Sequence, residues 1–191
     1  MQGKIKISLV GGFLITAAAM GYLDSFLKSY SAPWGIVSYE LAYNATQVQM
    51  MLNEWARQGQ VAAAIGLGLD FLFIPLYCSV MWMITTPLVR NAASRWVLRG
   101  SMFVSMYWLI PVAGVLDVVE NLGLMRALLI DVNEHWVMLS SVSAHLKFFV
   151  LAVWGNVAFV LWLALRKSKS SKGFTPNNGR PIAPQTKPIS R

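Results

Sequence analysis

The sequence predicts an all-α, polytopic membrane protein, a four-helix transmembrane bundle with an amphipathic helix in one outer loop. Three observations predict this fold class. Of the 191 residues, 56% are hydrophobic and only 13% are charged. The apolar residues form four runs, each long enough to cross roughly 30 Å of hydrocarbon at about 1.5 Å per residue. Acidic and basic residues flank opposite ends of these runs, a sorting for which a soluble domain has no reason.

The predicted spans cover about residues 7–27, 61–85, 98–125 and 141–165. With their loops they form one unit, residues 1–166. The first run also fits a cleaved signal peptide, because Lys4 and Lys6 precede it and the small residues 17–19 resemble a cleavage site. Its apolar pattern continues helically to Phe26, which favours a retained span.

The basic residues indicate an orientation. They gather at the N-terminus, in the loop after the second span and beyond Arg166, with no acidic residue among them. Because Lys and Arg near short loops stay cytoplasmic, we expect an inner-membrane protein with both termini in the cytoplasm. Residues 167–191 are rich in Ser, Lys, Asn and Pro and predict a disordered basic cytoplasmic tail.

The same charge distribution bears on partners. A net charge of +8 without a folded basic face argues against nucleic acid, and membrane lipids are the expected partners. Small residues such as Gly11, Gly12 and Gly21 in the first span permit close contact with another helix, so a homo-oligomer is possible. No motif identifies a cofactor.

The long outer loop holds the predicted amphipathic helix, over residues 44–58. Its apolar residues recur at helical spacing, with Gly59 as the expected stop. This helix either lies in the headgroup plane, which is the simpler alternative, or folds over the mouth of the bundle as a lid. Glu40 and Trp55 are the candidate residues of that lid or mouth.

Polar side chains inside the spans are the candidate site. Asp117, Glu120 and Asn121 project from one face of the third span, because they follow i, i+3, i+4 spacing. Asp70 on the second span lies at nearly the depth of Asp117, roughly 12 to 14 Å below the outer boundary by helical rise. We therefore expect these carboxylates to meet in the outer half of the bundle, where ionisable groups are costly and usually functional.

The fourth span supplies two candidate counter-groups, His145 and Lys147, which project about 200° apart. Periodicity places His145 inward with Ser141 and Asn156, and directs Lys147 toward the outer headgroups. Depth favours the opposite choice, because Lys147 lies level with Glu120 and a buried carboxylate needs a cation. Both residues remain candidates at this point.

Four sequence patterns together resemble an uncharacterised family of small four-span bacterial membrane proteins. The resemblance covers roughly residues 30–150 and implies an architecture and a set of positions, with no reaction. It adds weight to Glu40 and Lys147. The patterns are Pro33-Trp34-Gly35-Ile36-Val37 with Glu40-Leu41, Leu67-Gly68-Leu69-Asp70-Phe71-Leu72-Phe73, Leu116-Asp117-Val118-Val119-Glu120-Asn121, and Leu146-Lys147-Phe148.

The sequence leaves three functions open and does not decide whether the protein is an enzyme. A structural or accessory role ranks first, with the polar cluster fixing helix register. The first alternative is a lipid-phase binding protein or an acid–base enzyme acting on a lipid or isoprenoid. The second is proton or cation transfer. We predict no metal site, because the sequence has only His135 and His145 and lacks a zinc-binding motif; an oxygen-rich site for a hard cation is the alternative.

Overall fold

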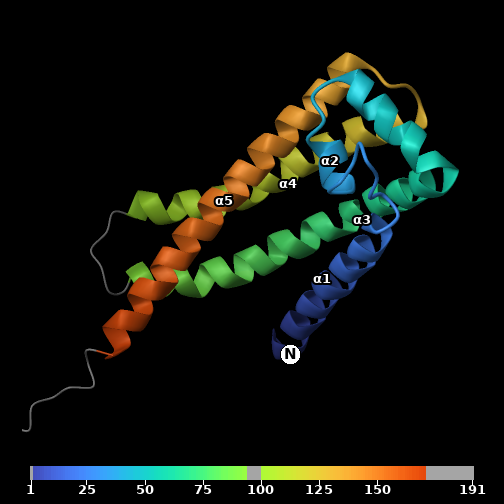
Figure 1. Cartoon of the computed structure of the whole chain (residues 1–191). Helices are drawn as coiled ribbons and strands as arrows, with labels where there is room; N and C mark the ends of the chain where they lie inside the picture. The colour runs from blue at the N-terminus through green and yellow to red at the C-terminus, as the bar shows by residue number, and fades with distance from the viewer. Residues whose placement is uncertain (1, 94–99, 171–191) are drawn as a thin grey trace, which may run out of the picture.

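The computed structural model describes residues 2–93 and 100–170, and within them every regular element is a helix (Figure 1). In chain order the helices are α1 (Gln2–Asp24), α2 (Ile36–Glu40), α3 (Ala45–Ala93), α4 (Gly100–Leu129) and α5 (Glu134–Ser170). All but α2 are long and apolar enough to cross a membrane. The predicted all-α bundle is therefore confirmed, and the chain is a multi-pass membrane protein.

The observed helices extend the predicted spans at several ends. α5 continues to Ser170, so the first residues of the predicted tail are helical. The rest of that tail, 171–191, and the predicted start of the third span at 98–99 lie outside the described residues.

The two ends of the bundle differ in construction. At one end, which we call the capped end, α2 and the connecting segments lie over the converging helices (Figure 1). At the other, which we call the open end, α1 and α5 lie apart (Figure 1). Within residues 2–93 and 100–170, α1 packs chiefly against α3, whereas α5 packs on both α4 and α3.

The capped end is closed by residues 25–56, which we call the cap. α3 begins in the cap and breaks at Ala56, whose φ of 48° and ψ of −164° are non-helical. The amphipathic helix therefore ends at Ala56, three residues before the predicted stop at Gly59, and a second helical segment continues from the kink to Ala93. A Cβ at Gly59 would lie 2.7 Å from the Trp55 Cβ, so only glycine allows the bend to close this tightly.

The amphipathic segment of the cap buries its apolar face against the protein. Four side chains of this apolar face are only 1–6% exposed, and they pack with residues of α4 and α5. The headgroup-plane alternative for this segment is therefore wrong, and the lid alternative describes its position. These four residues are Val48, Met51, Leu52 and Trp55.

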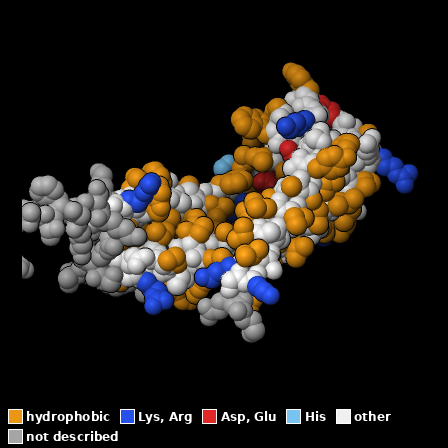
Figure 2. All heavy atoms as spheres, turned by 90° about the horizontal axis from the view of Figure 1, so that it is seen from below, with side chains coloured by type: hydrophobic (Ala, Val, Ile, Leu, Met, Phe, Trp, Pro, Cys, Tyr) orange, Lys and Arg blue, Asp and Glu red, His pale blue; other side chains and the backbone are white. Residues whose placement is uncertain are grey.

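The remaining surface of the long helices is largely apolar. Hydrophobic side chains spread over their length, and Lys and Arg side chains gather toward the ends (Figure 2). Leu72, Phe149 and Val160, for example, are 54%, 66% and 61% exposed. Such a surface suits contact with acyl chains, as expected of spans that each face lipid on one side.

Candidate functional site

Glu40 reaches the bundle interior because α2 begins at a specific turn. Gly35 has a φ of +59°, a conformation that favours glycine. A Cβ at this position would overlap the Asp24 carboxylate, which accepts a hydrogen bond of 2.6 Å from the Ile36 N–H. Asp24 thus caps α2, and the single turn that follows carries Glu40 inward from its last position.

The cap holds α2 in place through two buried aromatic residues. The Tyr39 hydroxyl donates to the Leu124 carbonyl at 3.0 Å, and the Trp55 indole N–H donates to the Leu27 carbonyl at 2.6 Å. Their rings meet edge to face, with centroids 5.2 Å apart. Trp55 is therefore a structural residue of the cap and lies behind Tyr39, whereas Glu40, the other predicted mouth residue, points inward.

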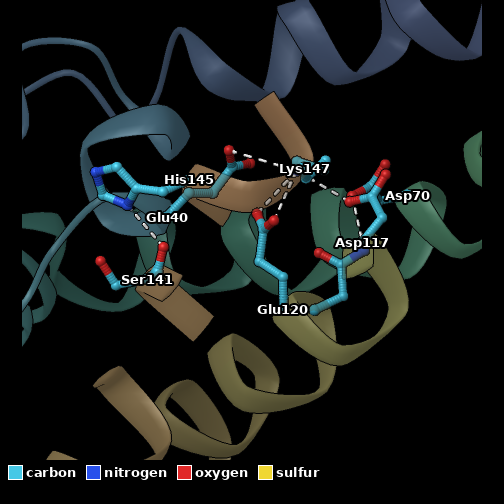
Figure 3. Close-up of polar contacts among 8 residues, drawn as sticks. Glu40, Asp70, Asp117, Glu120, Ser141, His145 and Lys147 are labelled. Atoms are coloured by element: carbon cyan, nitrogen blue, oxygen red, sulfur yellow. Dashed lines mark hydrogen bonds and ion pairs between the residues drawn. The ribbon is translucent and has the colours of Figure 1, made fainter. Parts of the chain in front are cut away.

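The polar cluster comprises Glu40, Asp70, Asp117, Glu120 and Lys147, which Figure 3 labels, together with Asn121. Its centre is the Lys147 ammonium from α5, whose Nζ lies 3.0 Å from Asp117 Oδ1 and 2.8 Å from Glu120 Oε2. Glu40 Oε2 is farther from this nitrogen, at 3.9 Å. One cation therefore joins α2, α4 and α5.

Asp70 joins the same cluster through an amide. Asn121 Nδ2 donates to Asp70 Oδ2 at 2.7 Å, which links α4 to α3. Asp70 and Asn121 are both buried. This is expected if Asp70 meets the polar face of the predicted third span. Carboxylates from separate helices thus share one interior site.

The structure separates the two candidates on the fourth span. Lys147 is 5% exposed, whereas His145 lies on the exposed side of α5 and its Nδ1 contacts the Ser141 carbonyl at 2.7 Å. Figure 3 shows His145 directed away from the cluster. The inward placement of His145 and Asn156 from periodicity is wrong, because pairing Lys147 with several carboxylates outweighs the polarity pattern of the helix.

An open pocket of about 390 Å³ borders the cluster. Its polar lining residues, which we call its floor, are Glu40, Asp70, Tyr77, Asp117 and Lys147. Its apolar walls include Phe13 and Met20 from α1, and Phe148 and Leu151 from α5. Residues of both α1 and α5 line the pocket, whereas α1 packs chiefly on α3, so the pocket lies between α1 and α5.

Tyr77 is a lining residue on the helix stripe of the second span that the sequence predicts for Asp70. It is 8% exposed, and its hydroxyl lies near Asp117 without a hydrogen bond that satisfies it. Its position two turns after Asp70 on α3 was the available signal, since residues seven apart share a helix face.

The cluster contains more carboxyl groups than cations. Glu40, Asp70, Asp117 and Glu120 surround Lys147 alone, so full ionisation would leave a net charge of −3 from four carboxylates and one ammonium. Such a charge is very costly away from water. The cluster therefore holds protons or receives a further cation.

Glu40, on the short helix outside the spans, is suited to hold such a proton. Burial is the largest cause, and it raises the pKa of Glu40 from 4.5 to about 7. The nearby Asp70, Asp117 and Asp24 raise it further, against the lowering effect of Lys147. Glu40 is thus poised to gain or lose a proton near neutrality.

No group of three or more His, Cys, Asp or Glu in residues 2–93 and 100–170 is arranged to hold a metal ion. The site therefore offers acid–base and ion-pairing chemistry from its carboxyl groups and its lysine. Comparison with known proteins assigns it no activity, since no family model, curated protein or solved structure matches the chain.

Proposed function

We propose that this protein binds an amphiphilic molecule of the lipid phase in the pocket between α1 and α5. The molecule's polar group would lie on the polar cluster and its apolar part against the walls. The observation that carries this proposal is a pocket, lined by α1 and α5, that joins an apolar wall to a charged floor. A volume of about 390 Å³ lies within the range of roughly 300–1,000 Å³ that small-molecule sites occupy.

A structural role for the same cluster is the second candidate. It is supported by the way Lys147 joins α2, α4 and α5, because such contacts fix how helices pack in the absence of a hydrophobic driving force. A purely structural cluster, however, would not need a pocket beside it or an unpartnered hydroxyl such as that of Tyr77.

Proton or cation transfer has less support. Toward the open end, one polar contact joins α3 to α5 and another lies within α5. Thr85 accepts from Trp154 Nε1 at 3.0 Å, and Asn156 donates to the Ala152 carbonyl of its own helix. These contacts do not extend the cluster into a path along the bundle.

The proposed location is the cell's inner membrane, with both termini cytoplasmic and the cap on the opposite side. The basic residues at the N-terminus, in residues 90–99 and beyond Arg166 support this orientation. In that orientation the cluster lies below the outer surface, and the pocket admits ligand from the outer half of the bilayer. Lipids are the proposed partners, and a second copy of the chain could cover the exposed side of α1.

Native mass spectrometry of the gently solubilised protein, followed by lipid extraction, tests the proposal. We expect an amphiphile to co-purify with the wild type and to be lost in Leu151→Trp, which fills the pocket. Leu163 lies on the same helix and is 40% exposed. Leu163→Trp therefore serves as the control and should retain the amphiphile. If well-folded wild-type protein carries no such molecule, or if Leu151→Trp carries it equally, the protein is not the proposed binder.

A further inference from the structure

The chemistry of the pocket floor restricts what kind of polar group it takes. Lys147 is the cation of the floor, and its short contacts go to Asp117 and Glu120. Glu40 lies farther from it, and Asp70 is held by an amide instead of a cation. Among the described residues, Asp70 thus forms no ion pair, and Glu40 has only the long one of 3.9 Å to Lys147.

A second, independent observation points the same way. The Tyr77 side chain is 8% exposed and lines the same pocket, and its hydroxyl lies near Asp117 without a well-formed hydrogen bond. An isolated buried hydroxyl costs free energy unless a ligand supplies a partner. Its oxygen can accept a hydrogen bond from a ligand while its proton turns toward Asp117.

The pocket therefore presents hydrogen-bond acceptors in excess. Glu40, Asp70 and Tyr77 offer oxygen atoms, whereas the lining donor, Lys147, already contacts carboxylates. A ligand that supplies several N–H donors and a positive charge would satisfy these acceptors and offset the negative charge of the floor. A phosphate or carboxylate headgroup would add negative charge there and would be repelled.

We infer that the ligand of this pocket is a lipophilic amine, a protonated primary or secondary amino group on an apolar body. The ammonium binds between Glu40 and Asp70 with Tyr77 as a further acceptor, and the hydrocarbon lies along Phe13, Met20 and Leu151. This inference rests on the proposed function, because it names the chemical class of the amphiphile that the pocket binds.

The test uses three probes of equal chain length, dodecylamine, dodecanol and dodecanoate. Each is added to the full-length protein in phosphatidylcholine nanodiscs, and binding is followed by native mass spectrometry and by the shift in melting temperature. We expect dodecylamine to bind at least tenfold more tightly than the other two.

Two variants tie the preference to the floor. Asp70→Asn and Tyr77→Phe should each reduce the preference for the amine over the alcohol at least threefold. Tyr22→Phe, an exposed tyrosine on α1, should leave it unchanged. Tyr77→Phe keeps the inference testable should Asp70→Asn fail to fold, because it removes one oxygen atom and no charge.

Three outcomes overturn the inference. Equal binding of amine and alcohol, both lost in Leu151→Trp, would show a lipid-phase pocket without preference for a cation, and the proposed function would stand. Tighter binding of dodecanoate would reverse the assigned charge. Failure of every probe to bind overturns the inference too, and overturns the proposed function only if the purified protein also carries no amphiphile.

Discussion

The capped and open ends of the bundle are stabilised in different ways. At the capped end, residues of the cap, α3, α4 and α5 share one continuous core, and loops and helices exchange buried hydrogen bonds. At the open end a small core centres on Ala92, Met106, Ala158 and Leu161, and α1 stands apart from α5 (Figure 1). The contrast teaches that this protein concentrates its internal packing around the polar cluster, while the open half relies on lipid to cover its helices.

Replacing the central cation should give the largest effect. Lys147→Met leaves the surrounding carboxyl groups without a counter-ion, and breaking a buried pair on one side costs about 3–5 kcal/mol. Arg166→Met, at the open end, should change stability little, because Arg166 is exposed and its contact is to the Trp162 ring at 4.5 Å. Thermal unfolding in detergent measures both. Equal melting temperatures for the two variants would break the comparison.

Replacing one tryptophan at each end should sharpen the comparison between the capped and the open end. Trp55 is 5% exposed and fills the cap, so Trp55→Ala should cost about 3 kcal/mol from lost packing. Trp108 on α4 is 67% exposed, and Trp108→Ala should cost far less in the same unfolding assay. A larger loss of stability in Trp108→Ala than in Trp55→Ala would mean that the open half carries the stability of the fold.

The pH dependence of stability should originate at the capped end. The pKa of Glu40 rises from 4.5 to about 7 on folding, so protonation favours the folded state. Its contribution is fully present below about pH 4.5 and is lost as the pH rises through about 7, a change of at most about 3.5 kcal/mol at roughly 1.4 kcal/mol per pKa unit.

The melting temperature of the wild type should therefore fall between pH 5 and pH 8 by more than that of Glu40→Gln. Parallel pH profiles for the wild type and Glu40→Gln would show that Glu40 does not titrate in this range. Other charged groups, from each element packed against Glu40, also influence its titration. They are Asp24, Asp70, Asp117, Glu120 and Lys147.

The smallest expected effect comes from one backbone position. Ala56 has a positive φ that strains an alanine, so Ala56→Gly should stabilise the protein by about 1 kcal/mol. The same change at Ala152, exposed within α5, should destabilise by about 0.5–1 kcal/mol because glycine weakens a helix. The unfolding midpoints of the two variants measure these opposite changes in stability. A destabilising Ala56→Gly would contradict the assigned strain.

The sequence predicted those parts of the site that depend on helical period. Asp117, Glu120 and Asn121 share a face by their spacing alone, and helical rise brought Asp70 to the same depth. Periodicity failed for Lys147, because the direction of that side chain is decided by carboxylates on other helices, which no pattern within one helix records.

The position of Glu40 was beyond periodic reasoning for another reason. It depends on the turn at Gly35 and on the cap that Asp24 supplies to α2, two contacts between segments distant in sequence. Likewise the sequence predicted the apolar face of residues 45–55, but it did not predict the surface against which that face packs. An amphipathic helix looks the same in sequence whether it covers lipid or protein.

The placement of Lys147 on the last helix has a consequence for biogenesis. Synthesis runs from the N-terminus, so Asp70, Asp117 and Glu120 emerge from the ribosome before their counter-ion exists. A nascent chain halted before α5 therefore carries these acids in its spans without the ammonium that Asp117 and Glu120 contact in the folded protein.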